Sequence, residues 1–427
     1  MKLKTIRNIF LSSAILLIVF GVGYRFGSQA STGFTAPVLR SSQVTGKDSA
    51  ASSAIDFSQF WEVWDSVSKN YIDKKAIDPA KMVNGAISGM VSSLGDPYTV
   101  FLPPTENKEA KDDLGGKFEG IGAQLGVKDK KIVVIAPLKG SPAEKAHLLP
   151  GDWIQKVGDK DTAELTLPEV VSQIRGPKGT SVTLLVLTKD ATKPAEVKVV
   201  RDSIEVASVE WEMKNVECSG SSGCQIRDAS CTNCSKVVYL KLTRFGDQTY
   251  TEWEKAIDEI DQAIQKFPKQ QVKGLVFDLR NNPGGYLTGS VFIGSEFLKD
   301  GTVVIQEASD GSRENQTVNR EGKLTDIPMT VLVNKGSASA AEIVAGALQA
   351  RSRAKIVGET SFGKGTIQQA FDLKNGAGLH ITMAKWLLPN GVWINGSGLT
   401  PDVKVELDAN KPDVDIQLEK AIDTLVQ

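Results

Sequence analysis

Short apolar runs separated by helix-length segments constrain the fold of this 427-residue chain more than any other feature. Four such runs occupy residues 274–279, 302–306, 329–333 and 355–358. Buried strands have this character. A small, apolar helix expected over residues 338–350 fits the same alternation. Residues 201–405 are therefore predicted to form an α/β core.

The remaining regions predict a multidomain α/β protein. Residues 56–112 are expected to be helical, with an aromatic stripe that begins at Phe57 and is predicted to pack against other apolar residues. Residues 113–200 carry short strands, glycine-marked turns and two short helices, which indicates a small mixed-β domain. A helical tail is expected over residues 406–427.

The N-terminus predicts export across the cytoplasmic membrane. Three basic residues within the first seven precede the apolar stretch 9–23, a pattern of a signal peptide or signal anchor over residues 1–27. The stretch is shorter than the roughly 20 residues of a spanning helix, and Ser28-Gln29-Ala30 offers a cleavage site. Both a cleaved and an anchored form stay open, with the anchored form slightly favoured. Residues 28–55 are rich in Ser, Ala and Thr, which predicts a flexible linker.

All four cysteines lie in an insertion at residues 217–236, as Cys218, Cys224, Cys231 and Cys234. An even, clustered set in an exported protein favours two disulfides. The Cys231-x-x-Cys234 spacing also fits a zinc ligand pair, whereas the spacing of the first pair does not. Disulfides and zinc therefore both remain open.

Composition restricts the classes of function that the chain can have. The 50 basic and 51 acidic residues leave no global positive field for nucleic acid. The chain has two histidines, His147 and His380, so a serine hydrolase would have to use one of these or another base.

Three segments could carry chemistry. In the first, NKGSASAAE, Ser339 follows an apolar strand and precedes a helix, so its hydroxyl would lie beside free helix N-terminal amides such as that of Ala340. Such a site suits a nucleophile. Taken alone, however, an ordinary capping box between Ser339 and Glu342 is the simpler interpretation.

The second segment is Gly363-Lys364-Gly365, with Gln368 four residues after the lysine. For Lys364 to act as a base, its pKa must fall from about 10.4 toward neutrality, which burial in an apolar pocket can achieve. A surface turn is the ordinary alternative. Residues 358–364 nearly match a phosphate-binding P-loop, but Gly365 stands where Ser or Thr belongs, and the following residues look extended.

The third segment is DLRNNPGG, residues 278–285, which follows a predicted strand. Its paired glycines would let backbone amides face a ligand, although alone it indicates only a loop.

Together DLRNNPGG, NKGSASAAE and GETSFGKGTIQ resemble the carboxyl-terminal processing, or tail-specific, serine peptidases. The resemblance extends to LGDPYTVFLPP near the N-terminus and to GLTPDV near the C-terminus. It implies that Ser339 is the nucleophile, that Lys364 is the general base and that Gln368 orients the lysine. The amides of Gly285 and Ala340 would form the oxyanion hole. The scarcity of histidine fits such a Ser-Lys pair.

The small domain resembles a PDZ domain. FEGIGA is similar to a carboxylate-binding loop, so the amides of Ile121, Gly122 and Ala123 would capture a peptide's terminal carboxylate while the peptide adds a strand beside residues 124–127. Arg175, in IRGPKG, is predicted to couple this domain to the core.

The sequence thus predicts a serine endopeptidase that binds polypeptides with apolar C-termini and cleaves exported or membrane-associated proteins. We expect it to be membrane-anchored, periplasmic or extracellular, to contact the membrane through its N-terminal segment, and to need no metal or organic cofactor. A homo-oligomer or an activating partner protein would be compatible with these features. The alternatives are a catalytically silent PDZ scaffold and a nucleotide-binding protein that uses residues 358–366.

Overall fold

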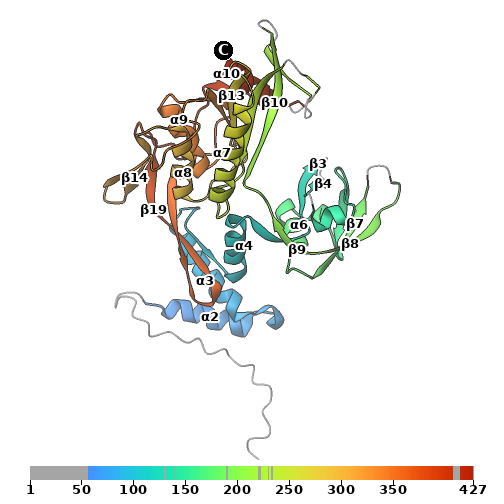
Figure 1. The fold of residues 1–427 in the computed structure, drawn as a ribbon. Helices are drawn as coiled ribbons and strands as arrows, with labels where there is room; N and C mark the ends of the chain where they lie inside the picture. The colour runs from blue at the N-terminus through green and yellow to red at the C-terminus, as the bar shows by residue number, and fades with distance from the viewer. Residues whose placement is uncertain are drawn as a thin grey trace, which may run out of the picture. The chain divides into compact units, whose positions relative to one another are not determined.

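The computed structural model describes residues 56–128, 131–138, 140–188, 191–219, 223–228, 230–231, 234–406 and 414–426 (Figure 1). The predicted leader, 1–27, and linker, 28–55, lie outside these residues. None of the helices within the described ranges combines the length and apolar character needed to cross a bilayer. The described residues divide into two compact units, one up to residue 86 and the other from residue 87 onward.

The first unit contains α2 (Ser58–Asn70), a 3-10 turn η1 (Lys74–Ala76) and the start of α3 (Pro79–Ser92). The sequence predicts that the aromatic stripe is core or a packing face; it is not core, because α2 buries none of its residues, and Phe57 and Tyr71 are about half exposed. Its rings contact one another instead, as Phe60 and Trp61 do edge-to-face at 4.9 Å. A stripe at helical spacing marks an apolar face and does not identify what covers that face.

The small domain contains a six-stranded sheet of order β3-β4-β5-β7-β8, with β6 paired to β5. Its strands are β3 (Ala123–Lys128), β4 (Lys131–Pro137), β5 (Trp153–Val157), β6 (Lys160–Asp161), β7 (Ser181–Leu187) and β8 (Ala195–Val200). The helices α5 (Pro142–Lys145) and α6 (Leu167–Ile174) contribute Ala143 and Val170 to its core. A two-stranded ribbon, β2 (Lys117–Gly120) and β9 (Asp202–Glu205), stands at the domain's entry and exit.

The core contains a seven-stranded sheet of order β11-β10-β12-β13-β16-β17-β20 (Figure 1). Its strands are β11 (Gly223–Arg227), β10 (Val209–Ser219), β12 (Ser235–Leu242), β13 (Val272–Asp278), β16 (Met329–Val333), β17 (Lys355–Gly358) and β20 (Val403–Lys404). The pairs from β12 through to β20 are parallel. Three of the four apolar runs in the sequence form the adjacent parallel strands β13, β16 and β17, which confirms them as buried strands of an α/β core. The fourth run, 302–306, lies in β14 (Thr302–Ala308), whose pairs are antiparallel and belong to another sheet.

Helices cover both faces of this sheet, as its apolar strands require. On one face, Phe277 of β13 and Val331 of β16 pack with α7 (Thr249–Gln265), α8 (Leu287–Phe297) and α9 (Ala340–Ala350). On the other face, the alternate residues Val276 and Leu332 pack with α10 (Ile416–Val426).

A second, antiparallel sheet joins distant parts of the chain. It has the order β1-β19-β14-β15, with β18 also paired to β19. The strands are β1 (Val100–Leu102), β14 (Thr302–Ala308), β15 (Arg313–Thr317), β18 (Thr366–Asp372) and β19 (Gly378–Leu387). Because a strand and not a helix follows Lys364, the P-loop alternative is wrong: its anion site needs a helix N-terminus there.

The cysteine insertion forms two disulfides, Cys218–Cys224 and Cys231–Cys234. The first closes the β10–β11 hairpin, where the two residues are cross-strand partners. Since all four sulfur atoms are bonded in pairs, none is a thiolate ligand, and the zinc alternative is not supported. The hairpin also contacts α10, because the Cys224 N–H donates to Asp423.

Candidate active site

The three segments singled out in the sequence follow three neighbouring parallel strands. Residues 278–285 follow β13, residues 334–339 follow β16, and residues 359–365 follow β17. The carboxyl ends of adjacent parallel strands meet at one edge of a sheet, which is where α/β proteins place their sites. The fold itself therefore brings these segments together.

Ser339 lies in a strained turn between β16 and α9. The helix begins at Ala340, two residues later than the sequence predicted, so Ser339 is its N-cap, with φ 53° and ψ −117°. A non-glycine residue at positive φ is uncommon and has to be held by its surroundings. Here the Ser339 N–H donates to Glu342 Oε2 at 2.8 Å, and the Ala338 N–H donates to Asn282 O at 2.9 Å.

Glu342 joins this turn to the lysine loop. Its carboxylate is fully buried and also accepts hydrogen bonds from Ser361 Oγ at 2.5 Å, Gly363 N at 2.6 Å and Lys364 N at 3.0 Å. The sequence predicted only a capping box between Glu342 and Ser339. One signal in the sequence could have indicated the three other bonds. Glu342 is an acidic residue in an otherwise small and apolar helix, and a buried carboxylate needs several hydrogen-bond partners.

The backbone around Lys364 is enclosed. A Cβ on Gly363 would lie 2.7 Å from Gly398 N, and one on Gly365 would lie 2.6 Å from Trp393 Nε1, so only glycine fits on either side. Trp386 Nε1 donates to Lys364 O at 2.8 Å. The lysine loop is therefore fixed both by Glu342 and by residues 386–398, which pack against it.

The Lys364 side chain is partly buried against the N-terminal segment that leads into β1. Its Nζ lies 4.9 Å from the centre of the Tyr98 ring. Burial lowers the pKa of Lys364, while the carboxylates of Asp96 and Glu342 act in the opposite direction. Within the described residues, Nζ donates no hydrogen bond, to Ser339 or to any other group. The sequence did not predict these roles for Asp96 and Tyr98, although both lie in the LGDPYTVFLPP segment.

Gln368, on β18, lies in the same cleft but contacts other partners. Its amide donates to Thr366 Oγ1 at 2.9 Å and to Thr382 Oγ1 at 3.0 Å. The Thr382 N–H in turn donates to Thr99 Oγ1, which donates to Asp96. The orienting role of Gln368 toward Lys364 thus stays a prediction, because the described contacts connect the two residues only indirectly.

The glycine pair packs directly against the Ser339 turn. A Cβ on Gly284 would lie 2.8 Å from Ser339 Cβ, and one on Gly285, at φ 139°, would lie 2.0 Å from Phe245 O. Among the described residues, neither the Gly285 N–H nor the Ala340 N–H donates to another protein group. Both amides are therefore available to a ligand beside Ser339.

One cleft contains all five residues that the resemblance assigns to catalysis. It has a volume of about 710 Å³ and is lined by Ser339, Lys364, Gln368, Gly285 and Ala340, together with side chains such as His380 and Met383. Asp113 and Leu114, at the end of α4 (Pro104–Leu114), and Arg244 also line it. A polypeptide substrate is consistent with so large an open cleft.

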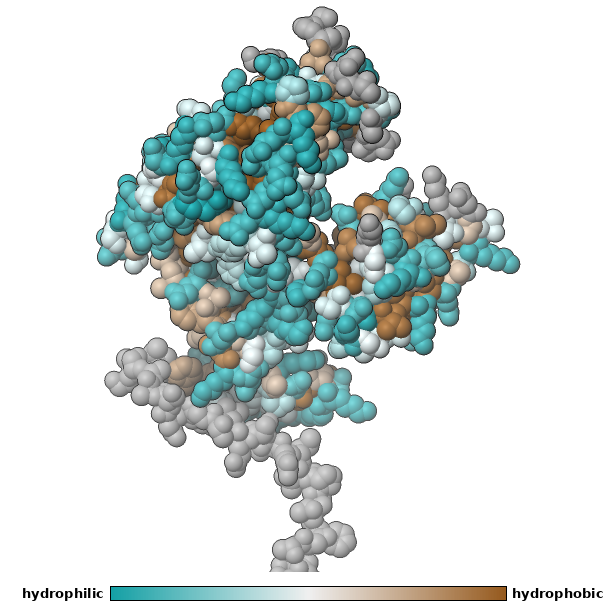
Figure 2. Space-filling model, in the orientation of Figure 1, coloured by the Kyte–Doolittle hydropathy of each residue, from teal (hydrophilic) through white to brown (hydrophobic). Residues whose placement is uncertain are grey.

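The small domain carries the predicted carboxylate-binding loop between β2 and β3. Ile121 is buried, and Gly122, at φ 72°, packs so closely that a Cβ would lie 2.5 Å from Ser141 Cβ. The Ile121 and Gly122 N–H groups donate to no other group among the described residues, and Ala123 begins the edge strand β3, which contacts α6. Figure 2 shows apolar residues gathered on this domain, and Val127, at the end of β3, is 59% exposed.

Arg175 immediately follows α6 and contacts the chain that enters the small domain. Its Nη2 lies 3.2 Å from Asp113 Oδ1, and its guanidinium lies 5.0 Å from the centre of the Phe118 ring. The backbone carbonyl of Asp113 also accepts a bond from Arg244 Nη1 at 3.2 Å. Asp113 and Arg244 both line the cleft. Arg175 therefore contacts a residue of the cleft lining but does not line the cleft itself.

Comparison with known protein families gives matches to three successive parts of the chain. Residues 236–405 match peptidase family S41, residues 109–187 match the PDZ domain, and residues 18–105 match the N-terminal domain of the activating protease CtpB. The carboxy-terminal processing protease CtpA of Bacillus subtilis (strain 168) is 36% identical over 371 residues, which is 87% of this chain and 73% of CtpA. CtpB of the same strain is 35% identical over 359 residues, covering 84% of this chain and 69% of CtpB.

A solved structure shows the same likeness. The photosystem II D1 C-terminal processing protease is 28% identical and superposes with a TM-score of 0.52, covering 86% of this chain and 96% of that protein.

Replacing Glu342 by Gln should destabilise the core. The amide group of glutamine has donors where the carboxylate accepts, so two of the four hydrogen bonds would face a donor. We expect the free energy of unfolding of the core to fall by about 2–4 kcal/mol, measured by denaturant titration. The matched control is Glu254→Gln on the exposed face of α7, which should change stability little. Equal midpoints for the two variants would contradict the role assigned to Glu342.

Proposed function

Because the chain belongs to the carboxy-terminal processing serine proteases of peptidase family S41, we propose that it is an endopeptidase with Ser339 as nucleophile and Lys364 as general base. One observation carries this proposal: the turn of Ser339 and the loop of Lys364 share the carboxylate of Glu342 and border the same cleft. The nucleophile occupies the strand-to-helix turn between β16 and α9.

The reaction follows from the groups in the cleft. Ser339 Oγ attacks a peptide carbonyl while the neutral Lys364 amine accepts its proton. The amides of Gly285 and Ala340 donate to the oxygen that becomes negative. Lys364 then protonates the leaving amine, and water hydrolyses the acyl-enzyme. Gln368, which lines the same cleft, orients the lysine side chain in this proposal.

The charge state of Lys364 limits this reaction, because only the neutral amine can accept the proton. Its partial burial favours that form. In the described structure its Nζ is placed over the Tyr98 ring, so the amine must approach Ser339 when substrate binds. Such tightening on binding is usual in enzymes, whose catalytic contacts are often long in the free state.

The PDZ domain supplies the substrate class in this proposal. A peptide that adds to the edge strand β3 would place its carboxylate at the amides of Ile121, Gly122 and Ala123, and its apolar last side chain beside α6. The substrates are then exported or membrane-associated proteins with apolar C-termini. We further propose that the N-terminal segment keeps the enzyme at the membrane or releases it outside the cytoplasm, and that a second copy or an activating protein regulates it.

Substituting either member of the pair should abolish proteolysis. Ser339→Ala and Lys364→Ala should each lower cleavage of an unfolded protein by at least about 10³-fold, because nucleophile and base act as a unit. Lys335→Ala is the matched control, since Lys335 lies in the same segment but is exposed and pairs with Glu359. Equal cleavage by all proteins, or none by the wild type, would favour the silent PDZ scaffold.

Asp96 should set the pH dependence of activity. Its negative charge raises the pKa of Lys364. Other ionisable groups near the amine are Glu342, His380 and Tyr98. Activity rises as pH passes through the pKa of the base, so Asp96→Asn should move this rise to lower pH. The pH profile of kcat/KM measures the shift, with Asp310→Asn, on an exposed turn, as the control. A rise that stays in place or moves to higher pH would contradict the assignment.

Arg175 should couple peptide capture to cleavage. Arg175→Ala removes the ion pair with Asp113 beside the cleft, so addition of a peptide with an apolar C-terminus should change the cleavage rate less than in the wild type. Peptide binding itself, measured by fluorescence anisotropy, should be retained. If activity and its response to the peptide are both unchanged, the coupling role is discarded.

A further inference from the structure

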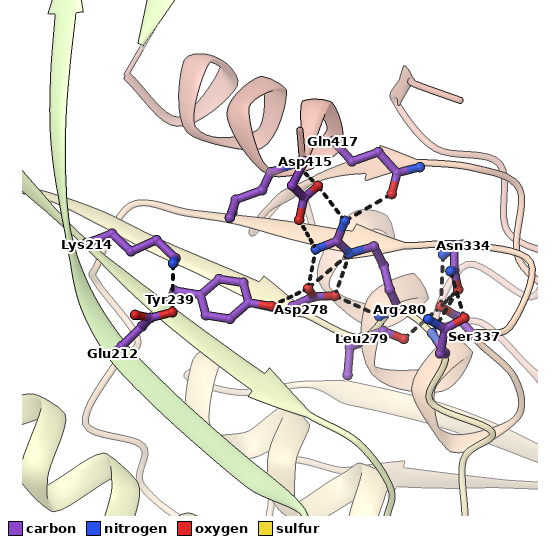
Figure 3. Close-up of polar contacts among 12 residues, drawn as sticks. Glu212, Lys214, Tyr239, Asp278, Leu279, Arg280, Asn334, Ser337, Asp415 and Gln417 are labelled. Carbon is purple, nitrogen blue, oxygen red and sulfur yellow. Dashed lines mark hydrogen bonds and ion pairs between the residues drawn. The ribbon is translucent and has the colours of Figure 1, made fainter. Parts of the chain in front are cut away.

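A buried ion-pair network connects the C-terminal helix to the loop that carries Gly285 (Figure 3). The loop begins where β13 ends, at Asp278. One carboxylate oxygen of Asp278 accepts the Arg280 backbone N–H at 2.9 Å, and the same carboxylate accepts Arg280 Nε and Nη2. The side chain of Asp278 is 2% exposed and that of Arg280 13%. The first turn of the loop is therefore closed by a desolvated ion pair.

Asp415 completes this network from the other end of the chain. Its two carboxylate oxygens accept Arg280 Nη1 and Nη2, each at 2.8 Å, and Gln417 Oε1 accepts Nη1 at 3.2 Å. A bidentate contact of this kind fixes the plane of a guanidinium. On the opposite side, the Tyr239 hydroxyl donates to Asp278 Oδ2 at 2.7 Å. As Figure 3 shows, Arg280 thus lies between Asp278 and the segment that starts α10.

From Arg280 the loop continues directly to the Ser339 turn. Asn281, at φ 58°, exchanges hydrogen bonds with Asn334: its N–H donates to Asn334 Oδ1 at 2.8 Å and its Oδ1 accepts from Asn334 Nδ2 at 2.9 Å. Asn282 O accepts the Ala338 N–H, and Asn282 Oδ1 accepts the Gly284 N–H at 2.8 Å. The position of Arg280 is therefore transmitted to both sides of the proposed oxyanion hole.

The glycines make the loop dependent on such anchors. Gly284 and Gly285 have no side chains to hold them, and both have positive φ. On one side the glycine pair is held by Phe245, whose N–H donates to Gly284 O at 2.8 Å. Before Gly284 in the chain, the loop depends on the turn that Arg280 closes with Asp278. Because oxyanion donors stabilise a transition state only when correctly placed, a loosened anchor should slow the chemical step more than it weakens substrate binding.

We propose that Asp415 is a positioning residue for catalysis, which holds the oxyanion loop through Arg280. This inference rests on the proposed oxyanion role of Gly285 and Ala340. It assigns the C-terminal helix, which contributes no residue to the cleft lining, a specific effect on the rate of acylation. Asp415 itself contacts neither substrate nor Ser339.

The informative substitution is Asp415→Asn. Asp415 also caps α10, since its Oδ1 accepts the Leu418 N–H at 3.0 Å, and asparagine is an equally good N-cap. The variant therefore removes the charge that pairs with Arg280 and keeps the start of the helix. The matched control is Asp423→Asn on the same helix, which contacts the Cys224 N–H and not Arg280.

We would measure kcat and KM of the full chain on an unfolded protein, inhibition by a peptide aldehyde whose adduct places an oxyanion beside Ser339, and thermal unfolding. Asp415→Asn should lower kcat by roughly 10-fold, less than the 10²–10³-fold loss for deleting a whole oxyanion donor. KM should stay within about two-fold, and aldehyde affinity should fall in parallel with kcat/KM. Asp423→Asn should leave kcat unchanged. Asp415→Glu, which restores the charge, should recover part of the loss.

The outcomes separate this inference from the proposed function. If the wild type shows no cleavage that depends on Ser339, the proposed function fails, whatever Asp415 does. If the wild type cleaves, the positioning role is overturned by an unchanged kcat in Asp415→Asn, by an equal loss in Asp423→Asn, or by a loss that only follows the fraction of unfolded protein. If Asp415→Asn does not fold, Asp415→Glu decides by the same comparison of kcat with KM.

Discussion

The carboxylate of Glu342 is the interaction on which the geometry of the cleft depends. It lies in the first turn of α9, has no exposed surface, and accepts hydrogen bonds from the Ser339 turn and from the loop that carries Lys364. A buried carboxylate is tolerated only when such partners are all in place. Each loop therefore stabilises the other, and Ser339 and Lys364, the proposed catalytic pair, are held at one edge of the sheet.

The same carboxylate affects the chemistry through its charge. Burial lowers the pKa of Lys364, whereas the negative charges of Glu342 and Asp96 raise it. Burial and the two carboxylates thus act on the pKa of the amine in opposite directions. Asp96 belongs to the same N-terminal segment as Tyr98, whose ring lies beside the amine. Segments far apart in the sequence surround the site: β1 pairs with β19, and Asp415 binds Arg280 in the loop that carries the glycine pair.

In this core the parallel strands provide fixed positions, and the glycine-rich loops that follow them provide close backbone approaches. Strands β13, β16 and β17 are covered on both faces, so their carboxyl ends are fixed in space. The loops that follow them contain glycines where backbone passes within contact distance of backbone, as Gly284 does beside Ser339 and Gly363 beside Gly398. Close approach of this kind is what allows amides, and not side chains, to surround a reacting oxygen.

The sequence by itself determined the buried strands of the α/β core, with β16 and β17 at the predicted bounds, and the three segments that resemble the processing proteases. These signals are local, because periodicity and motif spacing involve residues near one another in the chain. Only the tertiary structure decided that Glu342 joins two loops, that Tyr98 covers Lys364 and that Asp415 binds Arg280. Arg280 and Asp415 are 135 residues apart, and a hydrogen bond across such a separation leaves no periodic trace in the sequence.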